Sequence, residues 1–347
     1  MPACRVGGAS EAGHGRLDVL HCQPMTRPSI ALLGFGAALP ERVRTHEDPL
    51  FDRIREAARA KGVTEASLFY GNREHRCLEP GESLATLTAK AGRAALEDAG
   101  VGPEQVDRLY GYLSVSEFIT PNALYQVHRE LGLGPRVLVV PVHAEFANFV
   151  MSTVLAWEAM LAGHSERALV AVGAGWTRHM DYTQGHAFGV GDGAGAAVLG
   201  PGERFVLVDY AVNTFSEEYG AMTLRPRPES GLDKPVYGLE PVVGVEAFLH
   251  TGMDGPPRLV EALLRKHGLT GDDITLISHQ ATRKLLDHWN ERIRPREYLH
   301  TLEDFGNMVI ASIPVTLARY HREVRTKYLV LLGLGIGAHQ LALLVRV

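Results

Sequence analysis

The sequence is poor in cysteine and has no long apolar run. Its 347 residues include three cysteines, Cys4, Cys22 and Cys77, and none of them forms a CxxC pair or a Cys/His spacing typical of a metal site. So few thiols favour a reduced, cytoplasmic setting over a disulfide-rich, secreted one. Because no stretch of 18 or more apolar residues occurs, the sequence predicts no membrane-spanning helix and no membrane partner.

A basic tract is absent as well. The 40 Asp and Glu residues outnumber the 35 Lys and Arg residues, which gives a formal net charge of −5, so nucleic acid is not an expected partner. An apolar content of 46% with 22% charged residues is typical of a globular protein with a large core. Residues 1–27 show no apolar periodicity and no apolar segment like that of a signal peptide, so we expect a loose N-terminal extension.

The order of predicted elements repeats along the chain. In the first part, an amphipathic helix over residues 82–99 ends at Gly100, and a short loop leads to a strand at 108–113. In the second part, a helix over residues 259–267 leads through a glycine and a loop to a strand at 274–277. The same local plan therefore occurs twice.

Glycine-rich strand pairs follow in both parts. The pairs span residues 168–175 with 193–199 and residues 328–335 with 337–345. Their apolar character, with little alternation, predicts sheets covered by helices on both faces. The repeat favours a true duplication over a chance likeness of two α/β segments. We therefore predict an α/β fold of two βαβ-rich halves, residues 28–202 and 203–347, packed as a pseudo-dimer.

Three further motifs follow one another in a fixed order. They are the glycine-rich segment from Gly191 to Val198, the triplet His279-Gln280-Ala281, and Gly306-Asn307 with Ala311-Ser312-Ile313-Pro314 behind it. Together with the duplicated halves, these motifs resemble 3-oxoacyl-acyl-carrier-protein synthase III, a family of the thiolase superfamily. The resemblance covers residues 28–347. It implies a thiolase-like, five-layer αβαβα fold made of the two duplicated halves.

The resemblance also implies a Cys-His-Asn site. His279 and Asn307 match the two residues that polarise a thioester carbonyl in the family, and Gly335 matches the C-terminal glycine loop near the oxyanion site. Phe146 stands where the family has its nucleophilic cysteine. The expected site is therefore complete except for its nucleophile.

Partners follow from the same resemblance. The implied acyl donor is acyl-CoA or an acyl carrier protein, whose phosphopantetheine arm enters a tunnel, and a small molecule is the acceptor. No metal is expected, and no cofactor other than the coenzyme A or phosphopantetheine that is part of the donor. A homodimer is usual for the family, and a heterodimer is the alternative. Phe118 and Thr120 lie in the loop that the resemblance places across the dimer interface, near the partner's acyl pocket.

A phenylalanine at position 146 excludes the usual acyl-cysteine intermediate at this residue. A thiolate is both a strong nucleophile and a good leaving group, whereas a benzyl side chain has no lone pair to offer. Cys77 is no substitute, because it lies far in sequence from the site motifs, and the other two cysteines lie in the predicted extension. What remains is direct acyl transfer in a ternary complex, with His279 as base and Asn307 as carbonyl donor.

Three functions stay open at this point. The first is an acyltransferase that forms an ester or amide from an acyl thioester, in specialised or fatty-acid-like biosynthesis. The second is a catalytically silent subunit that pairs with an active, cysteine-bearing partner; the retained His279 and Asn307 argue against it. The third is a condensing 3-oxoacyl synthase whose cysteine was replaced by Phe146 through engineering.

Other polar residues have structural interpretations beside functional ones. The segment from Gly191 to Gly195 resembles a nucleotide-binding loop but lacks the P-loop lysine, so we predict a structural turn into a buried strand. His143 and Glu145 flank the site as an alternative acid/base pair or, as we favour, as polar groups at a strand–helix junction. Irregular spacing predicts no metal site in a third group, which comprises His179, Asp181 and His186.

Overall fold

The first part of the chain forms five strands of a large sheet and the helices beside them. The computed structural model describes residues 29–336 and 339–347, so the predicted N-terminal extension lies outside the described residues. The elements of this part are β1 (Ile30–Ala38), α3 (Leu84–Ala99), β4 (Arg108–Ser114), α4 (Leu124–Leu131), β5 (Leu138–Pro141), α5 (Asn148–Leu161), β6 (Ala168–Ala174) and β7 (Gly193–Pro201). Between β1 and α3, a small outlying unit comprises β2 (Val43–Thr45), α1 (Asp52–Ala60), α2 (Glu65–Leu68) and β3 (Glu74–Arg76).

The second part of the chain forms a similar set of elements. They are β8 (Val206–Thr214), α7 (Gly255–Lys266), β11 (Ile274–Ser278), α8 (Arg283–Ile293), β12 (Glu297–Tyr298), α9 (Leu302–Phe305), α10 (Ser312–Tyr320), β13 (Tyr328–Gly335) and β14 (His339–Arg346). An arm inserted between β8 and α7 carries β9 (Met222–Pro226), β10 (Pro235–Leu239), α6 (Val243–Ala247) and a π-helix (Phe248–Asp254).

The strand order shows the same pattern in both parts. The ten strands follow the order β12-β11-β13-β14-β8-β1-β7-β6-β4-β5. From the central pair β8 and β1 outward, each side has two antiparallel neighbours and then two parallel ones. Both predicted glycine-rich strand pairs are confirmed as antiparallel neighbours, β6 with β7 and β13 with β14. The division of the chain at residue 202 stays a prediction.

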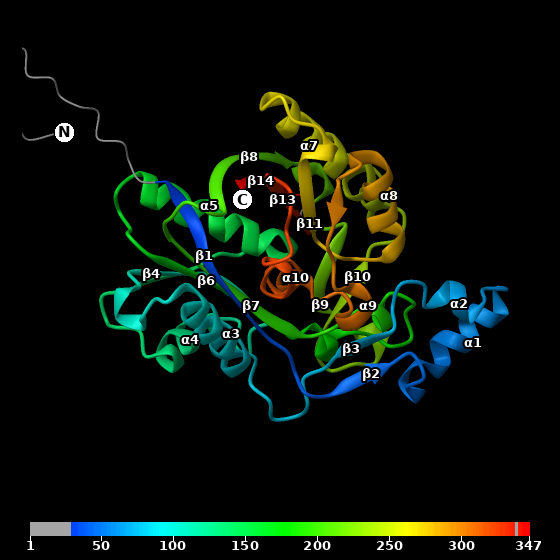
Figure 1. The fold of residues 1–347 in the computed structure, drawn as a ribbon. Helices are drawn as coiled ribbons and strands as arrows, with labels where there is room; N and C mark the ends of the chain where they lie inside the picture. Colours follow the sequence, from blue (N-terminus) through cyan, green and yellow to red (C-terminus); the bar gives the residue numbers. More distant parts are fainter. Residues whose placement is uncertain (1–28, 337–338) are drawn as a thin grey trace, which may run out of the picture.

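The strands of the first and second parts form two layers, and helices form three more. One helical layer lies between the two strand layers, and one lies on the outer face of each. α5 contacts β4 and β6 on one side and β13 and β14 on the other, while α10 contacts β1, β7 and β11. These two helices therefore lie in the middle of the molecule (Figure 1). α3 and α4 cover the outer face of the first half, and α7 and α8 that of the second. The order of layers is αβαβα, as predicted.

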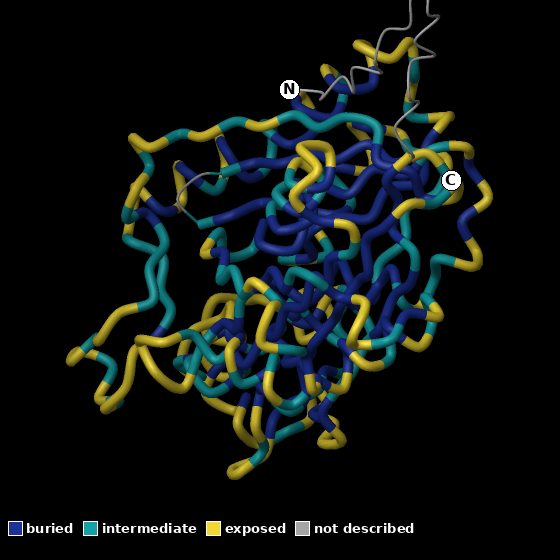
Figure 2. Tube along the Cα trace, turned by 90° about the vertical axis from the view of Figure 1, so that its left-hand side faces the viewer, coloured by how far each residue is buried: buried dark blue, intermediate teal, exposed yellow. Residues whose placement is uncertain are grey.

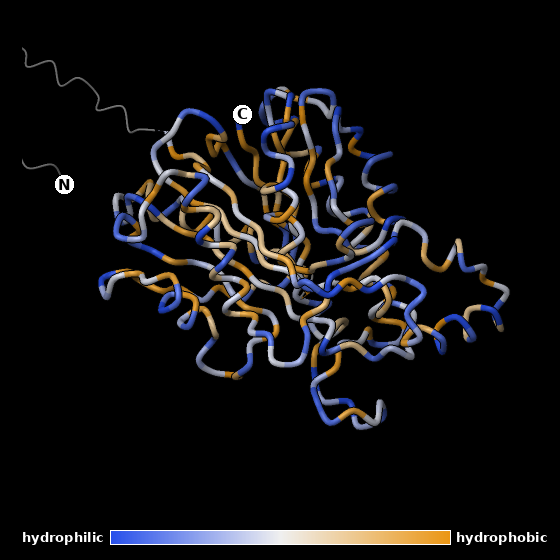
Figure 3. The backbone as a smooth tube through the Cα atoms, turned by 60° about the horizontal axis from the view of Figure 1, so that its bottom comes forward, coloured by the Kyte–Doolittle hydropathy of each residue, from blue (hydrophilic) through white to orange (hydrophobic). Residues whose placement is uncertain are grey.

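The core follows the strands and the two central helices. Every residue of β6 is buried, and the central strands are the apolar, glycine-rich segments noted in the sequence. Figure 2 shows the buried segments gathered in the interior and the exposed ones in the connecting loops. In Figure 3 the hydrophobic residues likewise follow the strands through the middle of the molecule. This burial of both sheet faces explains why the strands show little alternation.

Capping explains where the predicted helices begin and end. The helix expected from residue 82 begins at Leu84, because the Ser83 hydroxyl accepts a hydrogen bond from Thr86 N at 3.3 Å. It ends at Gly100, whose φ of +62° is the left-handed conformation typical of a helix C-cap. The helix expected from residue 259 begins four residues earlier, at Gly255, since prolines are tolerated in a first turn.

Candidate active site

A cavity of about 380 Å³ is lined by residues of both halves. Phe146, His279, Asn307 and Gly335 all line it, although they lie far apart in the sequence. The structure therefore brings together the four residues that were expected to form one site. The volume lies in the range of small-molecule sites in proteins.

Phe146 lies just before the N-terminal end of the central helix α5. It occupies the single 3-10 turn Glu145–Ala147 directly before that helix, and Glu145 has a φ of +36°, uncommon for a residue with a Cβ. The Phe146 ring stacks on the His279 imidazole, with centroids 5.1 Å apart and planes 11° apart. It also meets the Trp176 ring edge to face at 5.6 Å. Phe146 thus covers one face of His279.

His279 follows the last residue of β11 and is 1% exposed. Burial lowers the pKa of its imidazole to about 4, although the backbone of Val309 opposes this effect in part. Among the described residues, its Nδ1 has no hydrogen-bond partner within the usual geometric limits. The imidazole is therefore neutral at pH 7, with one nitrogen as donor and the other as acceptor.

Asn307 is held by the loop that precedes β7. Its backbone N–H donates to the Gly189 carbonyl at 2.7 Å, and its carbonyl accepts from Gly191 N at 3.0 Å. Its side-chain Oδ1 accepts from the N–H of Val309 at 2.9 Å, and Val309 has a φ of +50°. Because Oδ1 is engaged, the side-chain NH₂ is the group left to donate to a ligand.

Gly335 ends β13 at the cavity. A Cβ built on it would lie 3.0 Å from the carbonyl oxygen of Ala144, which is tighter than most such contacts. The strand end and the turn before α5 are therefore close enough that a glycine suits this position. Because of this close contact, the C-terminal end of β13 lies beside the turn that contains Phe146.

The glycine-rich segment before β7 has a structural role, as predicted. Asp192 is completely buried, and its carboxylate accepts hydrogen bonds from Leu78 N at 2.8 Å, Thr177 N at 2.9 Å and the Thr177 hydroxyl at 2.5 Å. Burial raises the pKa of Asp192, and these hydrogen bonds act in the opposite direction. Through Asp192, the segment is tied to the loops that contain Leu78 and Thr177.

His143 and Glu145 form a hydrogen-bonded pair that does not line the cavity. His143 Nε2 lies 2.7 Å from Glu145 Oε1, and this contact raises the pKa of His143. The other Glu145 oxygen accepts from the Ser114 hydroxyl at 2.7 Å, which in turn accepts from Trp176 Nε1 at 2.8 Å. The pair therefore anchors a wall residue of the cavity at the strand–helix junction.

Phe118 and Thr120, which were expected at a dimer interface, lie outside the cavity of their own chain. Phe118 is 61% exposed, and both Phe118 and Thr120 belong to a surface loop rather than to the cavity of their own chain. His179 and His186, which belong to the group of polar residues before β7, do not lie at one site. The His179 Nδ1 atom lies 3.0 Å from the carbonyl oxygen of Pro235, whereas His186 lines the cavity. Within residues 29–336 and 339–347, no group of three His, Cys, Asp or Glu side chains is arranged to hold a metal ion.

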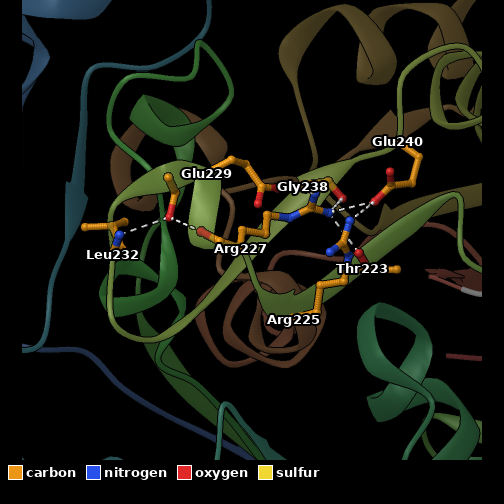
Figure 4. Close-up of polar contacts among 8 residues, drawn as sticks. Thr223, Arg225, Arg227, Glu229, Leu232, Gly238 and Glu240 are labelled. Carbon is orange, nitrogen blue, oxygen red and sulfur yellow. Dashed lines mark hydrogen bonds and ion pairs between the residues drawn. The ribbon is translucent and has the colours of Figure 1, made fainter.

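The inserted arm supplies cavity residues that the sequence did not point to. Tyr237 and Met222 reach the cavity from the paired strands β10 and β9. Arg227 fixes this pair, as Figure 4 shows, by donating to Glu240 at 2.9 Å and to Thr223 at 2.9 Å. No local motif marks these residues, because their role depends on how the arm folds back over the site.

Comparison with known proteins gives matches to one family. The model of the family 3-oxoacyl-[acyl-carrier-protein] synthase III matches residues 142–214, and its C-terminal model matches residues 264–347. A β-ketoacyl-[acyl-carrier-protein] synthase III of Gloeobacter violaceus is 27% identical over 333 residues, which cover 92% of this chain and 98% of that protein. One from Rhizobium rhizogenes is 29% identical over 301 residues, covering 82% and 88%.

Solved structures show the same fold. The 3-oxoacyl-(acyl carrier protein) synthase III of Pseudomonas aeruginosa superposes with a TM-score of 0.78 at 23% identity, covering 92% of this chain and 98% of that one. The priming β-ketosynthase of the R1128 polyketide pathway gives 0.79 at 24% identity, covering 92% and 97%. Among the described residues, no helix is both long and apolar enough to cross a membrane. The chain therefore has a thiolase-like fold and is similar in sequence, in both of its parts, to the 3-oxoacyl-[acyl-carrier-protein] synthase III family.

Proposed function

We propose that this protein is an acyltransferase that acts on an acyl thioester without forming an acyl-cysteine. The curated relatives are β-ketoacyl synthases III, which are transferases, and they supply the substrate class. The observation that carries the proposal is that Phe146, rather than a cysteine, shares the cavity with His279 and Asn307. The product is an ester or an amide, made in specialised or fatty-acid-like biosynthesis.

The position of Phe146 supports its correspondence to the family's cysteine. It stands at the N-terminal end of a buried central helix and faces His279, where a helix N-terminus would stabilise a thiolate. Among the described residues, Cys77 is the free cysteine, and it does not line the cavity. Burial raises the pKa of the Cys77 thiol to about 12, so it stays protonated and unreactive at pH 7.

The remaining donors support direct transfer. Asn307 NH₂ holds the thioester oxygen while the hydroxyl or amine of the acceptor attacks the carbonyl carbon. A C–O or C–N bond forms, the C–S bond breaks, and the acceptor's proton passes by way of His279 to the departing thiolate, which leaves as a thiol. A pKa of about 4 keeps His279 neutral but makes it a weak base. The proton therefore passes through the imidazole in concert with attack instead of residing on it.

A silent subunit is the second candidate, and one contact favours it. The Phe146 ring lies over His279 at 5.1 Å and covers one face of the imidazole. A protein that only shapes the site of a cysteine-bearing partner would not need that face. Under this candidate the purified chain turns nothing over, and activity appears only when the partner is added.

Intact-mass spectrometry of the protein and of Phe146→Cys tests the proposal. After incubation with hexanoyl-CoA, we expect no added mass on the natural chain and one hexanoyl group on the variant, because only the variant carries a nucleophile at this place. Release of free coenzyme A that depends on an added alcohol or amine supports direct transfer. A hexanoyl adduct on the natural chain, or no turnover in a broad acceptor screen, would contradict it.

We further infer that the donor is delivered on coenzyme A or an acyl carrier protein and that the protein is a homodimer. The edge strand β5 supports the dimer, since it has a free ladder side and its Leu138 is 51% exposed. The loop of Phe118 and Thr120 would then reach towards the partner's cavity. Native mass spectrometry is expected to give twice the mass of the chain; a monomer at micromolar concentration would refute the dimer.

A further inference from the structure

One wall of the cavity is an unbroken row of aromatic rings. His186 meets Tyr237 edge to face at 5.3 Å, and Tyr237 meets Trp176 in the same way at 5.5 Å. Trp176 then meets Phe146 at 5.6 Å, and Phe146 stacks on His279 at 5.1 Å. All five side chains line the cavity, and we call this row the ring wall.

The ring wall leads from solvent to the buried end of the site. His186 is exposed and Tyr237 is half-buried, while Trp176 is 2% and His279 1% exposed. A molecule that enters at His186 therefore meets ring after ring until it reaches His279. Aromatic pairs in edge-to-face or offset contact gain energy beyond that of simple apolar burial, so this surface favours a planar, aromatic ligand.

The charged groups that act on the outer end of the ring wall have protein partners. The charged groups that influence His186 are Asp181 and Arg227. Arg227 is paired with Glu240, and Asp181 accepts from the N–H and hydroxyl of Thr183. Although part of the His186 side chain is exposed, desolvation by the protein atoms around it lowers its pKa, and burial lowers the pKa of His279, so both imidazoles are neutral at pH 7. Of the other cations that line the cavity, Arg283 is paired with Asp287 and Glu303, and Lys284 is exposed to solvent. A charged ligand placed against the rings would lose hydration without a counter-charge in the ring wall itself, which favours an uncharged one.

The outer end of the ring wall offers two polar groups. Among the described residues, neither the Tyr237 hydroxyl nor the His186 imidazole has a hydrogen-bond partner, and both line the cavity. At the inner end lies the His279 imidazole, through which the proton passes in the proposed transfer. A ligand that spans the wall can therefore place one polar group at each end.

We propose that the acyl acceptor is an uncharged aromatic alcohol or arylamine bound along the ring wall. Its ring lies against Trp176 and Tyr237, its nucleophilic O–H or N–H points to His279, and a second polar substituent bonds to Tyr237 or His186. This inference rests on the acyl transfer proposed above. In that transfer the acceptor's O–H or N–H bond breaks, its oxygen or nitrogen takes the acyl group, and the proton leaves with the thiol.

Three alcohols of similar size test the inference. Ligand-observed saturation-transfer NMR, without donor, compares 2-phenylethanol with 2-cyclohexylethanol and with 4-(2-hydroxyethyl)benzoate. We expect 2-phenylethanol to bind about two- to tenfold more tightly than its saturated analogue, the range of one aromatic pair, and the benzoate to bind worst. A second assay follows transfer of hexanoyl from its N-acetylcysteamine thioester to the same alcohols.

Variants locate the effect on the ring wall. Tyr237→Leu and Trp176→Leu should both abolish the preference for the aromatic ring, and using two variants guards against one that fails to fold. Trp157→Leu is the matched control, because Trp157 pairs with Tyr210 and does not line the cavity. Tyr237→Phe should leave the preference but remove the added affinity of 2-(4-hydroxyphenyl)ethanol over 2-phenylethanol.

The outcomes separate this inference from the proposed function. Tighter binding of 2-phenylethanol than of its saturated analogue supports the inference that the ring wall binds an aromatic acceptor, even if no ester forms. If no ester forms, only the proposed direct acyl transfer is contradicted. Equal binding of the aromatic and saturated alcohols overturns the inference, even if both are acylated. A Tyr237→Leu variant that keeps the full aromatic preference also overturns it, because the ring would then be recognised elsewhere.

Discussion

At the scale of single residues, the proposed transfer depends on three side chains that share one cavity. Phe146 cannot be acylated, His279 is neutral, and Asn307 keeps an NH₂ group available for a carbonyl oxygen. In the proposed transfer, binding and polarising the thioester therefore do not need a thiol at residue 146. Forming a covalent intermediate would need one, and this is how the proposed reaction differs from an ordinary condensation.

Replacing His279 or Asn307 by alanine is expected to lower kcat for acyl transfer by about 10²–10³ in each case. The reason is that each variant removes a preorganised group aimed at the reacting carbonyl or proton, worth on the order of 3 kcal/mol. Steady-state kinetics with hexanoyl-CoA and a reactive acceptor measure the loss. His164→Ala, at an exposed position away from the cavity, serves as the control and should keep full activity. Full activity in both site variants would remove these residues from the mechanism.

The pH dependence of the rate follows from the buried imidazole. The pKa of His279 is about 4, against an ordinary 6.5, so the group is already neutral throughout the range from pH 5.5 to 8. We expect kcat/KM to show no inflection near 6.5 that arises from His279 and to fall only as the pH approaches 4. Rate profiles of the natural chain at constant ionic strength check this. An inflection near 6.5 that disappears in His279→Asn would contradict it.

At the scale of elements, the loop before β7 fixes the position of Asn307. Gly189 and Gly191 exchange backbone hydrogen bonds with Asn307, and Asp192 ties the same loop to Leu78 and Thr177. A Cβ on Gly191 would lie 2.2 Å from the carbonyl oxygen of Phe305, much closer than such atoms can approach. The loop therefore needs glycine there for steric reasons.

Gly191→Ala is expected to destabilise the protein by about 1–3 kcal/mol and to lower acyl transfer, since the segment with Asn307 has to shift. Gly134→Ala is the matched control, because a Cβ there meets nothing within 4 Å. Urea unfolding and steady-state rates measure both effects. If the two alanine variants behave alike, the close packing between the loop and Phe305 does not position Asn307.

At the scale of the whole molecule, two buried histidines couple stability to pH. His75 and His279 both have a pKa of about 4 in the folded protein, where burial disfavours the charged form, against 6.5 when unfolded. As the pH falls below 6.5 the unfolded chain binds protons first, so stability declines and continues to decline until about pH 4. Each histidine accounts for up to about 3 kcal/mol of this loss.

Urea unfolding at pH 7.5, 6, 5 and 4.5 measures this decline. Replacement of His75 by glutamine should make the free energy of unfolding fall less steeply between pH 6.5 and 4.5, because one group that charges on unfolding is removed. His164→Gln, at an exposed position, should leave the slope unchanged. A slope that is the same in all three proteins would show that buried histidines do not drive the acid sensitivity.

Local sequence patterns and tertiary packing determine different parts of this molecule. The repeated helix, glycine, loop and strand, and the apolar runs of β6 and β13, are local patterns, and each was visible before the fold. His279 and Asn307 were also visible, since each belongs to a short motif. Tyr237 and Trp176 were not, because their place in the cavity depends on long-range packing that no neighbouring residues encode.

The sequence by itself therefore determined the α/β class with its repeated elements, the two short motifs that contain His279 and Asn307, and the absence of a thiol at residue 146. Such features depend on hydrophobic periodicity, on turn residues and on what a side chain can do chemically. Only the tertiary structure decided that Phe146 lies against His279, that burial makes that histidine a weak base, and that the inserted arm completes the ring wall. The reason is that distances and burial between distant segments arise when the two halves pack together.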